Sequence, residues 1–160
     1  MLKLYLDSSV ILKRYITEPG TQLTDTIFEG AEAGEFTLTF SLWNIGEALE
    51  ILDERRRKGW LTEEEFKNIV TFFADEITKL MRLRTLEITP IYASILTAAW
   101  KIIINHHIYE ADAIQITTCT NTQSDALISG DEKLIETGTK IGIKAFHITR
   151  DEQKIKDFIR

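Results

Sequence analysis

The chain has 160 residues, which is enough for one domain with a full hydrophobic core but short for two. Hydrophobic residues make up 44% of the chain, as is ordinary for a globular protein. Acidic residues outnumber basic ones by 25 to 19, which gives a formal net charge of −6. The average surface therefore repels nucleic acid, and a nucleic-acid partner would need a local basic patch or a bound cation.

No stretch of the sequence has the length of a membrane span, since apolar runs such as Ile102–Ile104 fall far short of the roughly 20 residues required. The first residues, Met-Leu-Lys-Leu-Tyr-Leu-Asp, do not form a signal peptide. The lone cysteine, Cys119, has no partner for a disulfide or a zinc site, so we expect it in the core. These features predict one cytoplasmic domain over residues 1–160, with no membrane partner.

Short apolar runs with β-branched or aromatic residues predict strands, and a segment of helical character follows each of them. The predicted strands are Leu2–Leu6, Phe36–Phe40, Leu86–Thr89, Ala126–Ser129 and Ala145–Ile148. No repeat and no Pro/Gly/Ser-rich linker divides the chain. Strands that alternate with helices in this way are typical of an α/β fold with a mainly parallel sheet.

Two helices are predicted between the second and third strands, over residues 42 to about 58 and about 62 to 82. Thr62 and Glu65 have the spacing of a capping box, and Gly59 can end the preceding helix. The two helices should form a helical hairpin. Apolar residues recur at helical spacing along its second arm, which favours a core or partner interface over a ligand site. They are Phe66, Ile69, Val70, Phe73, Ile77, Leu80 and Met81.

Basic residues that could contact nucleic acid gather at two places. The run Arg55–Lys58 at the end of the first hairpin helix complements a helix dipole, which favours a solvated face over a basic patch for a partner. Lys13 and Arg14 follow the first strand by one to two helical turns. They are candidate substrate-binding residues that could contact a phosphate. The alternative, which the sequence supports equally, is that both side chains are simply exposed to solvent.

Acidic residues follow two of the predicted strands. Asp7 comes directly after Leu2–Leu6, and Asp131 stands just beyond Ala126–Ser129. In a parallel α/β sheet the reactive groups collect beyond the carboxyl ends of the strands, so both acids are placed for a site. Helix capping is the alternative, because Asp is a good N-cap and both positions lead into apolar helical sequence. Position alone does not decide between the two roles.

Asp112 is harder to explain as a cap. If residues from Glu110 to about Thr122 are helical, Asp112 lies at the centre of the apolar face, with Thr117 and Thr118 on the other side. A buried, ionised carboxylate is costly unless it is paired or binds a metal. The position therefore indicates a functional acid, with a hydrogen-bonded structural carboxylate as the alternative.

A further acid is available in the helix after the second strand, where periodicity favours neither Glu47 nor Glu50. Carboxylates that converge in one crevice would raise each other's pKa unless a cation neutralised them. Mg²⁺ or Mn²⁺ fits that need, because hard divalent ions prefer oxygen ligands, and such a site can activate water for attack on a phosphodiester. The hydroxyls of Ser9 and Ser129 could support the carboxylates or metal-bound waters.

The acids lie in four segments: YLDSS at 5–9, NIGEAL at 44–49, ADAIQI at 111–116 and LISGDEKL at 127–134. In order and spacing they resemble the four acidic motifs of PIN-domain nucleases, especially the VapC-type toxins of toxin–antitoxin pairs. The tail IGIKAFHI at 141–148 matches the glycine and closing strand that usually follow. The resemblance implies that Asp7, Glu47, Asp112 and Asp131 are the catalytic and metal-binding carboxylates. It also selects Glu47 over Glu50.

The resemblance implies a Rossmann-like three-layer fold of about five mainly parallel strands and metal-dependent endonucleolytic cleavage of RNA. It further implies the toxin role in a type II toxin–antitoxin system, homodimerisation, and inhibition by a small antitoxin. The alternatives are a PIN-domain nuclease of RNA processing and a non-catalytic PIN module that binds nucleic acid or protein. A metal-dependent phosphatase is less favoured, because a haloacid-dehalogenase-like enzyme would have a second aspartate where Ser9 stands.

Overall fold

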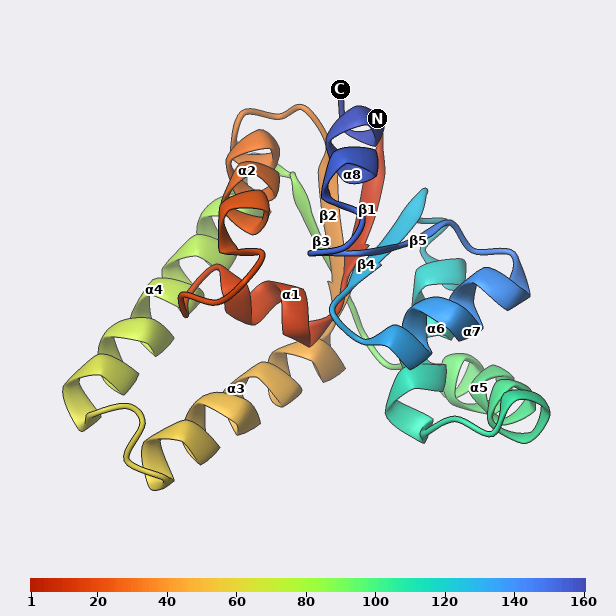
Figure 1. Ribbon diagram of the computed structural model, residues 1–160, viewed down its shortest axis with the longest axis horizontal. Coiled ribbons are helices and arrows are strands. Elements are labelled where there is room, and N and C mark those ends of the chain that lie inside the picture. The colour runs from red at the N-terminus through yellow and green to blue at the C-terminus, as the bar shows by residue number, and fades with distance from the viewer.

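One sheet of five parallel strands runs through the middle of the computed structural model, which describes all 160 residues (Figure 1). The strands are β1 (Lys3–Leu6), β2 (Thr37–Ser41), β3 (Leu86–Thr89), β4 (Ala126–Ser129) and β5 (Ala145–His147). They lie in the order β3-β2-β1-β4-β5. The predicted α/β fold is confirmed, and every strand pair is parallel. The order reverses between β1 and β4, so the two crossovers leave the sheet in opposite directions there.

Helices cover both faces of this sheet and give the predicted three layers. They are α1 (Ser8–Lys13), α2 (Thr21–Glu32), α3 (Leu42–Arg57), α4 (Glu63–Leu83), α5 (Ala93–His106), α6 (Glu110–Asn121), α7 (Glu132–Ile141) and α8 (Glu152–Phe158). Figure 1 shows α1 to α4 on one side of the sheet and α5 to α7 on the other. None of these helices combines the length and the apolar character that crossing a membrane requires.

Two hydrophobic cores form because successive side chains of a strand point to opposite faces of the sheet. Leu4 and Leu6 of β1 belong to the larger cluster, which α1 to α4 and α8 complete. Tyr5, between them in the sequence, belongs to the smaller cluster with residues of α5 to α7. Cys119 is buried in that second cluster, as predicted.

The predicted helical hairpin is present as α3 and α4. Thr62 Oγ1 accepts a hydrogen bond from Glu65 N at 3.1 Å, and Glu65 Oε2 accepts one from Thr62 N at 2.7 Å, so the capping box is complete. Gly59 adopts a left-handed φ of +74° in the turn. Along α4 the apolar stripe packs on the larger core, except for Met81, which is exposed.

The helical wheel of α6 places Thr117 and Thr118 opposite its apolar face, yet both side chains are buried. Their hydroxyls donate to the carbonyl oxygens of Ala113 at 2.8 Å and Ile114 at 2.7 Å, one helical turn back. A threonine that satisfies its own hydroxyl in this way can be buried like a valine. The helix is therefore covered on nearly every side between the sheet and its neighbours α5 and α7, and a helical wheel cannot show this.

Candidate active site

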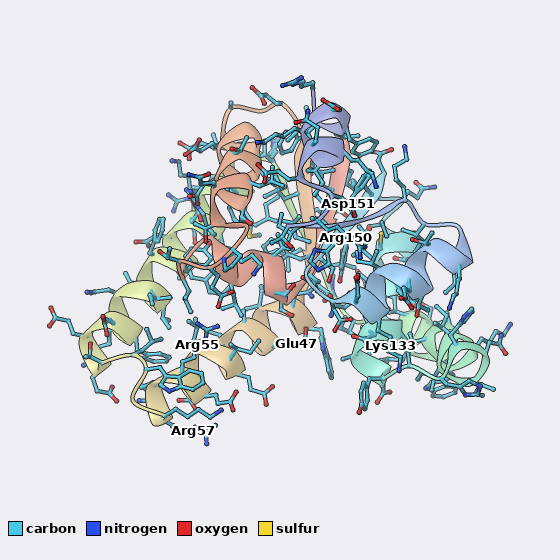
Figure 2. The ribbon with its side chains drawn as sticks, in the orientation of Figure 1. Glu47, Arg55, Arg57, Lys133, Arg150 and Asp151 are labelled. Carbon is cyan, nitrogen blue, oxygen red and sulfur yellow. The ribbon has the colours of Figure 1, made fainter.

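The predicted acids lie at the carboxyl edge of the sheet, at the point where the strand order reverses. Leu6 of β1 pairs with Ile128 of β4, so the turns that carry Asp7 and Asp131 follow neighbouring strands at the same edge of the sheet. Glu47 comes from the second turn of α3 and Asp112 from the first turn of α6. Figure 2 shows Glu47 on α3 and Lys133 on α7 at this edge. Ligands of open α/β sheets bind in the crevice at such a switch point.

Asp7 both caps α1 and is buried in the crevice, with an exposed fraction of 3%. Its Oδ1 accepts hydrogen bonds from the Ser9 hydroxyl at 2.6 Å and from Val10 N at 3.1 Å, and its Oδ2 accepts one from Ser129. Burial raises the pKa of Asp7, these three hydrogen bonds oppose the rise, and the charge of Glu47 adds to it. The roles of cap and site residue are thus compatible in this one side chain.

Ser9 and Ser129 join the two turns that follow β1 and β4. Ser9 Oγ accepts a hydrogen bond from Gly130 N at 2.8 Å, and Ser129 Oγ accepts one from Asp131 N at 2.8 Å. Each hydroxyl therefore donates a hydrogen bond to Asp7 and accepts one from the backbone of Gly130 or Asp131. A Cβ at Gly130 would stand 3.0 Å from Ser9 Oγ, so glycine permits this close approach.

Glu47 is half-buried, and residues of two other helices, α1 and α6, contact its carboxylate. Its Oε2 accepts a hydrogen bond from the Ser8 hydroxyl at 2.8 Å, and Gln115 Nε2 lies 3.5 Å from the same oxygen. The Gln115 amide is itself fixed, because its Oε1 accepts from Asn44 Nδ2 at 2.9 Å. The buried Tyr5 hydroxyl donates to Asn44 Oδ1 at 2.7 Å. A polar chain thus runs from β1 through α3 and α6 to Glu47.

Sequence reasoning missed these four supporting residues, Tyr5, Ser8, Asn44 and Gln115. Two signals were available. Asn44 stands three residues after Ser41, and the two form a capping box at the start of α3. Gln115 lies one turn after Asp112 on the same side of α6, so the two side chains should reach the same crevice.

Asp112 experiences the charges of the whole cluster. Its pKa rises from 3.8 to about 6, chiefly because the carboxylate is desolvated, and further because Asp131, Glu47 and Asp7 repel its charge. Lys133 opposes the rise, and no hydrogen bond from the protein does so. Asp131 itself is exposed and accepts a hydrogen bond from Leu134 N at 2.9 Å, which caps α7. The four acids are therefore close enough to interact electrostatically in one crevice.

Lys13 and Arg14 are engaged in ion pairs within the chain. Lys13 Nζ lies 3.1 Å from Glu18 Oε2, and Arg14 pairs with Glu76 at 2.7 Å and with Asp25 at 2.9 Å. The run at the end of α3 is also paired, in keeping with the solvated-face interpretation. Its four residues bind Glu18, Asp53, Glu63 and Glu54. In Figure 2, Arg55 and Arg57 lie along α3 away from Glu47.

The donor set of the crevice suits a hard divalent cation, because it consists of carboxylate oxygens that repel one another. No three acidic, histidine or cysteine side chains anywhere in the chain converge into a preformed metal cage. Mg²⁺ does not require one, since it commonly binds through one or two carboxylates and keeps several waters. The residues present therefore fit Mg²⁺ or Mn²⁺ bound at an open, partly hydrated site.

The fold and this cluster of acids agree with the family comparison. The family model for the PIN domain matches residues 4–140, so the chain belongs to the PIN domain family. The predicted family is thereby confirmed. A comparison with curated protein sequences gives no significant match.

Solved structures with a similar fold include three with TM-scores between 0.60 and 0.64. VapC20 of Mycobacterium tuberculosis, a sarcin-ricin loop cleaving toxin, has a TM-score of 0.60 at 12% identity, over 88% of this chain and 95% of that one. VapBC2 of Rickettsia felis, bound to promoter DNA, has a TM-score of 0.64 at 12% identity, over 91% and 98%. FitAcB of Neisseria gonorrhoeae has a TM-score of 0.62 at 16% identity, over 92% and 99%. At these identities the likeness shows the shared fold.

Proposed function

We propose that the protein is a divalent-metal-dependent endoribonuclease and the toxin of a type II toxin–antitoxin pair. The observation that carries the proposal is the convergence of Asp7, Glu47, Asp112 and Asp131 on one sheet edge, where the pKa of Asp112 rises to about 6 because of burial and its acidic neighbours. Such a site is electrostatically unfavourable in the isolated fold, and a cation relieves it. Strongly perturbed acids in a crevice are typical of catalytic sites.

The four carboxylates would hold Mg²⁺ or Mn²⁺, which when bound supplies an activated water and neutralises charge on the scissile phosphate. The remaining work falls to the chain itself. Ser9, Ser129 and Val10 N fix both oxygens of Asp7, and Ser8 fixes Glu47. Lys133, whose Nζ donates to His107 O at 3.1 Å, adds positive charge close to Asp112 and can attract a phosphate group.

The toxin role rests on the kind of proteins that share the fold. The similar VapC20 is a toxin that cleaves the sarcin-ricin loop, and the similar VapBC2 assembly is bound to DNA from its promoter. The chain also exposes large apolar residues on α5, namely Trp100 at 54% and Ile104 at 71%. Exposed apolar groups on one helix are suited to protein contacts, so an antitoxin partner and a homodimer are part of the proposal.

The test is an RNA cleavage assay with the purified protein, in parallel with the Asp7→Asn variant purified in the same way. We expect cleavage of single-stranded RNA in Mg²⁺ or Mn²⁺, none in a chelator, and none above background by the variant, which keeps the shape of Asp7 but loses its charge. Far-ultraviolet circular dichroism checks that the variant is folded. Cleavage in a chelator, or equal cleavage by Asp7→Asn, would overturn the metal–carboxylate assignment. A folded protein that binds RNA without cleaving it would favour the non-catalytic PIN module.

A further inference from the structure

A groove lies beside the acids along the first turns of α3. It has a volume of about 410 Å³ and is lined by Leu42, Trp43, Gly46, Glu47, Glu50 and Ile91. Trp43, Gly46, Glu47 and Glu50 recur at three- and four-residue spacing, so they share one face of the helix. Ile91, from the segment between β3 and α5, completes the lining. We call this feature the Trp43 groove, and it shares Glu47 with the acidic crevice.

Gly46 is the unexplained residue of the groove. Glycine in a helix interior costs about 0.5 to 1 kcal/mol relative to alanine. Several other glycines of this chain have a structural reason, such as the left-handed φ of +95° at Gly142. Gly46 has no positive φ, and a Cβ there would meet no atom within 4 Å. What Gly46 does provide is an open floor in the groove between Trp43 and the two glutamates.

The chemistry of the walls indicates what fits between them. The indole of Trp43 is 39% exposed and Leu42 is 54% exposed, so flat apolar surface faces the solvent here. Glu50 repels phosphate, but its oxygens can accept hydrogen bonds from the amino groups of a base. Unpaired bases stack on aromatic side chains, at a gain of about 1 to 3 kcal/mol per base. The volume is at the lower end for small-molecule sites, about 300 to 1,000 Å³, which suits one base.

We propose that the Trp43 groove binds one unpaired nucleobase of the RNA strand, stacked on Trp43, next to the phosphodiester held at the four acids. The inference rests on the proposed nuclease function and adds a base-binding subsite to it. Because Glu47 lines both the groove and the crevice, a strand whose phosphate lies at the acids passes the groove within a nucleotide. The subsite selects for single-stranded RNA, since a paired base cannot leave its stack without cost.

The subsite is tested by binding rather than by cleavage. A short single-stranded RNA with 2′-O-methyl riboses, which resists cleavage, is titrated in Mg²⁺ buffer and followed by fluorescence anisotropy. We expect Trp43→Ala to weaken binding about tenfold or more, the loss of one stacked base. Trp60→Ala is the matched control, because Trp60 is 67% exposed outside the groove, and it should bind like the wild type. The same RNA annealed to its complement should bind more weakly than the single strand.

Two substitutions of Gly46 give a second test of the subsite. Gly46→Ala should raise the melting temperature, because alanine favours the helix, and Gly46→Leu should weaken RNA binding about tenfold by filling the groove. If Gly46 had only a structural role, Gly46→Ala would not raise the melting temperature and Gly46→Leu would not weaken RNA binding. RNA affinity unchanged in both Trp43→Ala and Gly46→Leu overturns the subsite. So does a dimer in the wild type that dissociates in these variants, because a second copy then covers the groove. If the wild type binds RNA through Trp43 but never cleaves it, the subsite stands and the nuclease proposal fails.

Discussion

Replacing Asp112 with Asn should abolish RNA cleavage and, at the same time, stabilise the metal-free protein at pH 7 to 8. Activity should fall by at least about 100-fold, the scale seen when one group that stabilises the transition state is removed. Stability should rise because the carboxylate is desolvated and faces Asp131, Glu47 and Asp7. An amide of the same shape carries no charge and escapes that repulsion. Functional acids are often destabilising in this way.

The raised pKa of Asp112 determines how folding stability changes with pH. The pKa of Asp112 rises from 3.8 to about 6, so between these values the folded chain holds a proton that the unfolded chain has released. Folding stability therefore falls as the pH rises from about 4 to about 6 and stays low above that. The stability gap between Asp112→Asn and the wild type should open across this interval. Added Mg²⁺ should narrow it, because the ion binds only the folded site and stabilises the wild type more.

Thermal melts in a chelator at pH 4, 6 and 8 measure this effect, and Asp75→Asn is the control. Asp75 is an exposed aspartate on α4, far from the crevice in sequence, and its replacement should change neither the melting temperature nor cleavage. A lower melting temperature for Asp112→Asn at pH 8 would show instead that Asp112 is a structural carboxylate.

Glu76→Gln should be among the most destabilising substitutions outside the hydrophobic cores. Glu76 is 6% exposed and accepts hydrogen bonds from Arg14 Nη2 at 2.7 Å and from the Tyr15 hydroxyl at 2.7 Å. The bond to Glu76 raises the pKa of Arg14, so the guanidinium stays charged. Removing one member of a buried pair leaves an uncompensated charge and costs about 3 to 5 kcal/mol. Asp25, 2.9 Å from Arg14, still compensates part of that charge. We therefore expect the loss in the free energy of unfolding to lie at the lower end of this range.

Urea unfolding measures this loss, with Asp53→Asn as the control. Asp53 pairs with Arg56 at 2.6 Å and with Arg57 at 2.9 Å, but on the exposed side of α3. Exposed pairs of this kind contribute little to stability, because solvent and salt screen them. Equal losses in the two variants would mean that the pair of Glu76 with Arg14 is not effectively buried. A markedly larger loss of unfolding free energy in Glu76→Gln than in Asp53→Asn would support the role of Glu76 in joining α1 to α4.

The sequence predicts the fold well because its signals are local. Alternating apolar strands, the Thr62 capping box and the turn at Gly59 each depend on residues close together in the chain. The burial of Thr117 and Thr118 was not predicted, because it depends on neighbours of α6 that periodicity does not describe. Local patterns therefore determine the elements, and packing between elements determines which helix faces are covered.

The candidate site was predicted less completely, for the same reason. Asp112 was singled out because a single helix shows an acid on an apolar face. The choice of Glu47 needed the family resemblance, and its hydrogen bond from Ser8 joins residues 39 positions apart. Arg14 was considered for phosphate binding because it follows the first strand by one to two helical turns. Its pairing with Glu76, 62 residues away, is not visible in the sequence. Long-range partners of this kind become visible only once the chain is folded.

The central claim is that these four acids form the metal site of a nuclease, and Mn²⁺ tests it directly. Crystals soaked in Mn²⁺ should show an anomalous difference peak within coordination distance, about 2.0 to 2.5 Å, of Asp7 and at least one other acid of the crevice. The Asp112→Asn crystals should show a weaker peak or none. Mn²⁺ bound only elsewhere on the chain, or a crevice that stays empty at a Mn²⁺ concentration that supports RNA cleavage, would contradict a metal site at these acids.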